Sequence, residues 1–212
     1  MAPRLHFARA SSSSASDRVH RSRSGVTGVT RTEDAGWTLD VVRGWLDMAD
    51  AAPVPPSLAD ETRPGLVDQL RPGENDTGYL QVAATLPDAT APSLLLILGY
   101  HRLDGDFGAG AILVPETRRL FVAGGARAIC YHHDGDRWWR QWEVEVQVMV
   151  WGLARHGDHI VMSSELEVVV WDTKGVRRLR AGVEPPWGYE IHGNRMRLDI
   201  DGAVTTVDIP AG

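Results

Sequence analysis

The chain has 212 residues, of which 43% are hydrophobic and 24% are charged, and its formal net charge is −6. This composition is typical of a soluble globular protein and excludes a wholly disordered chain, a collagen-like repeat and a coiled coil. The single cysteine, Cys130, excludes an intrachain disulfide and a zinc site built from several cysteines.

Residues 1–31 differ in charge from the rest of the chain. They contain six arginines and one aspartate, a net charge of +5, so the remaining residues carry −11. Because this stretch has few apolar residues to bury, we predict a disordered basic tail rich in Ser and Arg. Its composition is also that of an organellar transit peptide.

The rest of the chain argues against two kinds of partner. An acidic body is a poor match for nucleic acid, whose phosphates bind clustered Lys and Arg. Apolar runs such as residues 94–98 are far shorter than the roughly 20 residues that a membrane helix needs. We therefore predict a cytoplasmic protein that binds neither nucleic acid nor membranes.

The first predicted element is a short amphipathic helix over residues 36–50. Large apolar residues recur there at helical spacing, namely Trp37, Val41, Trp45 and Met48. The alternative is a strand over residues 37–42.

A Pro-rich stretch follows this element. Three prolines in residues 51–57 indicate a linker, and residues 66–70 are predicted as one more helical turn. We expect the whole helical and Pro-rich segment, residues 36–75, to wrap around the main domain and cover an edge strand.

Residues 79–212 are predicted to form a β-repeat domain. Thirteen short β-rich runs, separated by Gly, Asp and Pro, are typical of a sandwich, barrel or propeller. The runs are 79–85, 94–100, 111–114, 119–122, 126–132, 138–146, 149–155, 159–163, 166–171, 176–181, 189–192, 195–200 and 203–209.

This domain contains an internal repeat. Residues 155–175 align with residues 115–135 at a shift of 40, and with residues 191–211 at a shift of 36. Each copy has a strand, a short turn, a strand and a Gly-containing turn. The period is close to that of a four-stranded propeller blade.

Two stretches within residues 111–212 resemble β-propeller repeats. Residues 163–180, SSELEVVVWDTKGVRRLR, resemble the third and fourth strands of a WD-repeat blade, with Trp171-Asp172 at the strand end. Residues 126–142, ARAICYHHDGDRWWRQW, are similar to quinoprotein-type repeats. The Gly-His pair and structural Asp of WD blades are absent. The resemblance implies a blade-like antiparallel meander and no particular activity.

The predicted fold class is mainly β, with antiparallel propeller-like or sandwich sheets and a short helical N-terminal segment. Residues 79–212 supply three units and part of another, whereas the smallest usual ring has four blades. The sheets therefore close into a small ring, stack as an open sandwich, or associate between chains as an oligomer.

No group of residues indicates a metal, a cofactor or a catalytic site. The densest histidine groups, His132-His133 and His156 with His159, lie at predicted turns, and neighbouring residues on a strand point to opposite faces. Cys130 lies in an apolar strand and is predicted to be an inert core residue. Nucleophile, phosphate-loop and dinucleotide motifs are absent. We expect no cofactor, no metal and no catalytic residue.

The candidate binding residues lie where a propeller gathers its turns. One rim is expected to hold the turns between second and third strands together with the connections between units. Five residues there are predicted to bind a ligand: Ser163, Ser164, Glu165, Glu184 and Trp187. A carboxylate beside an indole suits a sugar or a basic side chain. The alternative is that Pro185-Pro186 only turns the chain and Trp187 fills the core.

The sequence favours a non-catalytic binding or protein-interaction module over an enzyme. Its partner is expected to be another protein or a polar small ligand. The alternative is a hydrolase that acts on a glycan or another polar substrate through dispersed carboxylates such as Glu165 and Glu184.

Overall fold

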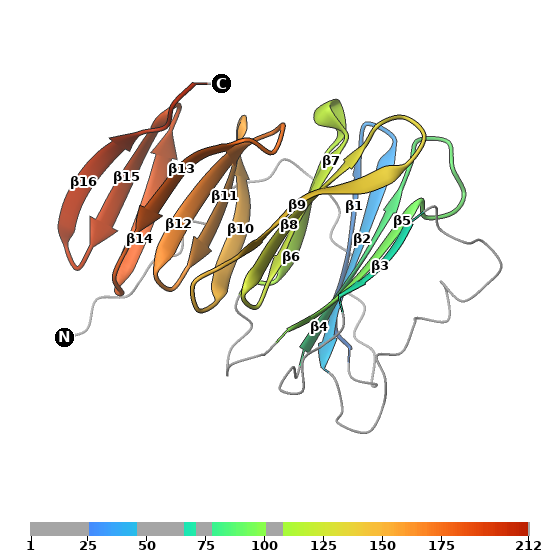
Figure 1. The fold of residues 1–212 in the computed structure, drawn as a ribbon, viewed down its shortest axis with the longest axis horizontal. Helices are drawn as coiled ribbons and strands as arrows, with labels where there is room; N and C mark the ends of the chain where they lie inside the picture. The colour runs from blue at the N-terminus through green and yellow to red at the C-terminus, as the bar shows by residue number, and fades with distance from the viewer. Residues whose placement is uncertain (1–25, 46–65, 71–77, 101–107, 212) are drawn as a thin grey trace.

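A computed structural model describes residues 26–45, 66–70, 78–100 and 108–211, which form sixteen strands and one short 3-10 helix. The strands make four sheets that follow one another in a row, with the first and last sheets at opposite ends (Figure 1). We name them sheets A to D in chain order. The described sheets therefore form an open stack of propeller-like units. The described residues contain no helix long and apolar enough to cross a membrane.

Sheet A has the strand order β1-β2-β4-β5-β3. Its strands are β1 (Val26–Asp34), β2 (Trp37–Trp45), β3 (Leu66–Leu70), β4 (Gly78–Thr85) and β5 (Leu94–Tyr100). All neighbours are antiparallel except β3, which runs parallel to β5. The predicted division at residue 79 falls at the start of β4, inside this sheet.

The predicted helix over residues 36–50 is wrong for its described part, which is strand β2. Trp37, Leu39 and Val41 alternate as buried residues, as they do on a strand with one face in the core. A spacing of four residues fits a two-residue period as well as a helical one, so Trp37 and Val41 satisfied both patterns. The alternative strand over residues 37–42 is confirmed.

Two further N-terminal predictions need correction. Residues 26–31 belong to β1, so the predicted disordered tail does not extend over them, and residues 1–25 lie outside the described part. Residues 66–70 form β3 in place of a helical turn, because the ladder with β5 satisfies their backbone. Most of the Pro-rich stretch also lies outside the described residues.

Thirteen strands follow from residue 78 onward, as predicted, with boundaries that differ by at most two residues. The last eleven are β6 (Gly110–Val114), β7 (Arg119–Gly124), β8 (Arg127–His133), β9 (Trp138–Glu145), β10 (Val150–His156), β11 (His159–Ser164), β12 (Glu167–Asp172), β13 (Arg177–Gly182), β14 (Trp187–His192), β15 (Arg195–Ile200) and β16 (Ala203–Asp208). The short helix η2 (Pro115–Thr117) joins β6 to β7.

The internal repeat is confirmed by the sheets. Sheet B is β6-β7-β8-β9, sheet C is β10-β11-β12-β13 and sheet D is β14-β15-β16, all antiparallel meanders. Strands β6 and β7 align with β10 and β11 at a shift of 40 residues, and β11 and β12 align with β15 and β16 at a shift of 36 residues.

Apolar side chains fill the spaces between successive sheets. The alternation along β12 shows the layering: Val169 and Trp171 belong to the core on the sheet B side, whereas Val168 and Val170 belong to the core between sheets C and D. A sheet with both faces covered explains why Val168–Trp171 is one continuous apolar run.

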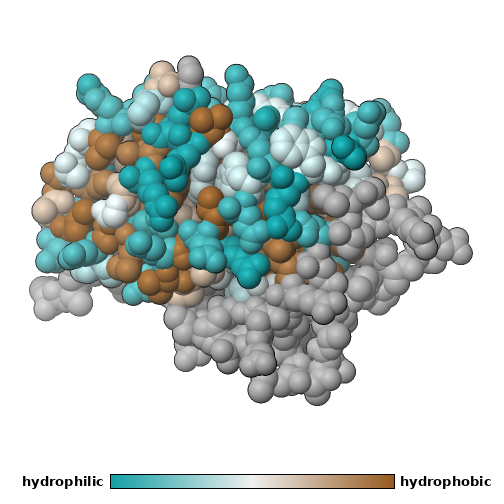
Figure 2. Space-filling model, viewed as in Figure 1, coloured by the Kyte–Doolittle hydropathy of each residue, from teal (hydrophilic) through white to brown (hydrophobic). Residues whose placement is uncertain are grey.

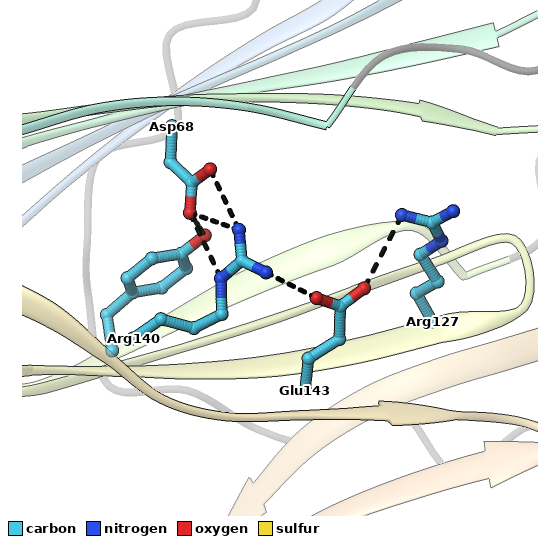
Figure 3. A network of polar contacts seen from close by, with 5 residues as sticks. Asp68, Arg127, Arg140 and Glu143 are labelled. Atoms are coloured by element: carbon cyan, nitrogen blue, oxygen red, sulfur yellow. Dashed lines mark hydrogen bonds and ion pairs between the residues drawn. The ribbon is translucent and has the colours of Figure 1, made fainter.

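A polar network fastens sheet A to sheet B (Figure 3). Asp68 on β3 accepts a 2.6 Å hydrogen bond from the Tyr131 hydroxyl and pairs with Arg140 at 2.7 Å. Arg140 also contacts Glu143, which lies 3.4 Å from Arg127. Burial and the bond to Asp68 raise the pKa of Tyr131, so its hydroxyl stays a donor. The network anchors edge strand β3.

The outer face of sheet D is charged. Arg195 pairs with Asp208 at 3.2 Å, and Arg197 pairs with Glu190 at 3.0 Å, all with exposed side chains. The opposite face of the same sheet carries Met196 and Leu198 into the core. Sheet D therefore has one apolar and one polar face.

Candidate binding rim

The turns and connections predicted to gather at one end do so, and backbone hydrogen bonds tie them together. We call this end the rim and define it as residues 124–126, 145–149, 163–166, 183–187 and 201–202. Each of the two connections 145–149 and 183–187 bonds to a turn of the unit before it and a turn of the unit after it. The bonds are Val146 N to Ala126 O (2.9 Å), Glu165 N to Met149 O (3.2 Å), Val183 N to Leu166 O (2.9 Å) and Asp201 N to Pro186 O (2.9 Å).

Trp187 lies at the rim with its ring buried. Its side chain belongs to the core between sheets C and D, and the residue is only 7% exposed. The indole stacks on Trp151 with centroids 5.8 Å apart, and its Nε1 donates to the Glu165 carbonyl at 3.1 Å. The buried ring agrees with the alternative stated from the sequence, in which Trp187 fills the core. The indole N–H still holds the turn that carries Glu165.

The two serines differ in exposure. Ser164 is fully buried, and its hydroxyl donates to the Glu167 carbonyl and accepts from the Glu167 amide, both at 3.1 Å. These bonds close the turn between β11 and β12. Ser163 is half-buried on β11. Ser164 therefore shapes the turn that presents Glu165.

Glu165 and Glu184 are brought to the same end of the molecule. Glu184 is exposed and Glu165 is half-buried, and neither side chain makes an ion pair within the described residues. Glu145 and Asp201 add two further exposed carboxylates on this rim that are also without ion pairs there. The rim is therefore acidic.

Val148 is the rim residue that sequence reasoning missed. Its φ angle is +66°, and the residue is 52% exposed. A β-branched residue in this left-handed region is a genuine outlier, because its side chain crowds the backbone. Pro185 and Pro186 are exposed on the next connection, between β13 and β14. No sequence signal marks a valine at positive φ.

Aromatic side chains continue from Trp187 along the first strands of sheets C and D. Tyr189 lies 6.2 Å from Trp187 and 5.8 Å from His156. Burial raises the pKa of Tyr189 to about 12, and burial together with nearby His159 lowers the pKa of His156. Both side chains are therefore neutral at physiological pH.

The other residues singled out from the sequence have packing contacts. His132 and His133 point to opposite faces of β8, where they make edge contacts with Trp139 and Trp138 respectively. Burial raises the pKa of Cys130 to about 12, so the thiol is protonated. Within the described residues, no three His, Cys, Asp or Glu side chains are grouped as metal ligands.

Comparisons with known proteins add little. No family model matches the chain, and no curated protein is significantly similar to it. Among solved structures, BamB from Moraxella catarrhalis aligns with 12% identity and a TM-score of 0.27, over 86% of this chain and 81% of that chain. A TM-score this low carries no argument, so the fold assignment rests on the sheets and the repeat described above.

Proposed function

We propose that this protein is a non-catalytic protein-interaction module that binds its partner at the rim. The observation that carries this proposal is Val148. A left-handed backbone costs a non-Gly residue about 1–2 kcal/mol, and a side chain left 52% exposed recovers little of that by burial. Stability does not explain a strained apolar residue held toward solvent, whereas a partner that covers it does.

The charge of the rim defines the partner's chemistry. Glu145, Glu165, Glu184 and Asp201 make no ion pair within the described residues, and Val148, Pro185 and Pro186 are exposed on the same rim. Residues 32–212 carry a net charge of −11, which attracts basic partners over a long range. The rim fits a segment that bears Lys or Arg beside an apolar side chain.

The rigidity of the rim favours binding. Its connections are bonded to the turns on either side, so little backbone freedom is lost when a partner docks. By contrast, the buried Trp187 offers no aromatic face to a sugar beside Glu165. The hydrolase alternative therefore gains no support.

The test uses the tripeptide N-acetyl-Arg-Leu-Arg-amide as a probe, titrated into the full chain and followed by NMR. We expect shifts at the amides of Val148, Glu165 and Glu184, and none with the Glu-Leu-Glu peptide. Val148→Gly and the double variant Glu165→Gln/Glu184→Gln are each expected to weaken binding by roughly tenfold, the loss of about 1.4 kcal/mol.

A stability control separates binding from folding. Val148→Gly relieves the backbone strain, so its melting temperature should match or exceed that of the unmodified protein. Val176→Gly alters a valine with similar exposure, 47%, but ordinary φ, and should destabilise the protein by about 0.5–1 kcal/mol while leaving the peptide affinity unchanged. Shifts spread over all acidic surfaces, or full affinity in Val148→Gly, would refute the rim as the binding site.

A further inference from the structure

The connection between sheets B and C, residues 145–149, has a conformation that its own sequence does not favour. It reads EVQVM, without the Gly, Pro, Asn, Asp or Ser that dominate turns, whereas every other segment of the rim contains at least one of them. Val148 within it nevertheless has a φ angle of +66°. Such a conformation persists only where the surrounding structure enforces it. Its cause therefore lies in the residues packed around the connection.

Hydrogen bonds hold this connection on both sides of Val148. Three of them join backbone atoms of residues 146, 149 and 150 to the turns 124–126 and 163–166. A fourth is different, because the amide of Gln147 donates to Oε1 of Glu167 at 3.0 Å. Of these four bonds, only this one uses a side chain. It fixes the residue directly before Val148.

Glu167 begins β12 and buries its carboxylate beside the connection. Its side chain is 3% exposed, and a carboxylate so buried costs free energy unless its oxygens are bonded. One oxygen accepts the Gln147 amide, and the other accepts a 2.5 Å bond from Nε of Arg180 on β13. Ser164 bonds the main chain of Glu167 on both its N–H and its carbonyl. Glu167 is thus fixed through its backbone and its side chain.

Exposure alone would not mark Val148 as a binding residue. On the face shown in Figure 2, hydrophobic residues lie among hydrophilic ones over the described sheets, and single exposed apolar residues are ordinary. Val176 has similar exposure with an ordinary φ angle. What distinguishes Val148 is a conformation imposed from below, by a side chain that has to be buried to reach Gln147.

We propose that Glu167 is the positioning residue of the rim. Its carboxylate holds Gln147 and thereby keeps Val148 in the left-handed conformation, with the valine side chain toward solvent. Arg180 compensates the buried charge. The inference rests on the proposed function of the rim, to which it adds a buried residue that shapes the site without touching the partner.

The test compares three double variants of the full chain, all with unchanged net charge. Glu167→Met/Arg180→Met removes the acceptor for Gln147, and Glu167→Gln/Arg180→Gln restores an acceptor in a side chain of similar shape. Removing both members of the pair leaves no buried charge unpaired. Asp172→Ala/Arg178→Ala is the matched control, because it breaks a 2.6 Å ion pair between the same two strands at the end of β12 away from the rim.

The first measurement is the NOE between the amide proton and Hα of Val148, which is strongest at positive φ because the two protons are then closest. We expect a strong NOE in the unmodified chain, the Gln variant and the control, and a weak one in the Met variant. The Gln147 amide should exchange at least about tenfold faster in the Met variant. A weak NOE in the unmodified chain or the control, or a strong one in the Met variant, overturns the proposal.

The second measurement is the affinity for N-acetyl-Arg-Leu-Arg-amide. The Met variant should bind roughly tenfold more weakly, and the Gln variant and the control should stay within about threefold. Full affinity in a Met variant that has lost the NOE overturns the proposal. If the unmodified chain does not bind the peptide, the binding function is refuted, whereas the NOE still decides whether Glu167 positions Val148. If the Met variant does not fold, Glu167→Ala/Arg180→Ala takes its place.

Discussion

Individual residues at strand ends hold neighbouring sheets in place. Trp171 stacks on Trp142 of sheet B with centroids 4.9 Å apart, and Asp172 accepts bonds from the amides of Lys174 and Val176. Burial raises the pKa of Asp172, but hydrogen bonds from Val176 and Arg178 outweigh burial and hold this pKa below its usual value. The Trp-Asp pair that resembles a WD repeat thus shapes a turn and an inter-sheet contact.

Val170 gives the sharpest test at the residue scale. It is fully buried between sheets C and D, so Val170→Asp places an unpaired charge in an apolar core. We expect a loss of about 4 kcal/mol or more in the free energy of unfolding, measured by urea titration. Val204→Asp, at a position 50% exposed, should change it by less than about 0.5 kcal/mol. Equal effects would contradict the assigned faces.

At the scale of elements, strand type was predictable wherever a Gly or Asp turn bounded an apolar run. Residues 166–171 are an example, since three consecutive valines and the turn Asp172–Gly175 agree there. The strand over residues 37–45 was not predictable in this way, because apolar residues spaced four positions apart fit a helix and a strand equally. Strand β3 pairs parallel to β5 and contacts Tyr131, 63 positions away, through Asp68, and no local pattern encodes either contact. The rim's position followed from the repeat, but the strain at Val148 did not.

The anchoring of β3 can be measured with a double-mutant cycle. Tyr131→Phe and Asp68→Ala should each destabilise the protein, and their coupling energy should be about 1–3 kcal/mol, as for a buried bond to a charged group. The same cycle on the exposed pair Arg195 and Asp208 should give less than about 0.5 kcal/mol. If the two cycles agree, the Asp68 network does not fasten the sheets.

For the whole molecule, the described sheets contact mainly their neighbours in the row, so stability should be local. Met196→Ala removes a fully buried side chain from the core of sheets C and D and should cost about 2–5 kcal/mol. Hydrogen exchange should quicken in β14–β16 and stay unchanged in β4 and β5. Leu96→Ala, in sheet A, should give the reverse pattern. Uniform quickening in both variants would indicate one cooperative unit.

The charged outer face of sheet D has a consequence for self-association. A stack of similar sheets can grow into a filament when its end faces are apolar, because each apolar face can pack against a further sheet. The ion pairs of Arg195 with Asp208 and of Arg197 with Glu190 would have to lose water before another layer could settle on them. We therefore expect this face of sheet D to resist packing of a further layer, as the polar face of a capping repeat does in a solenoid.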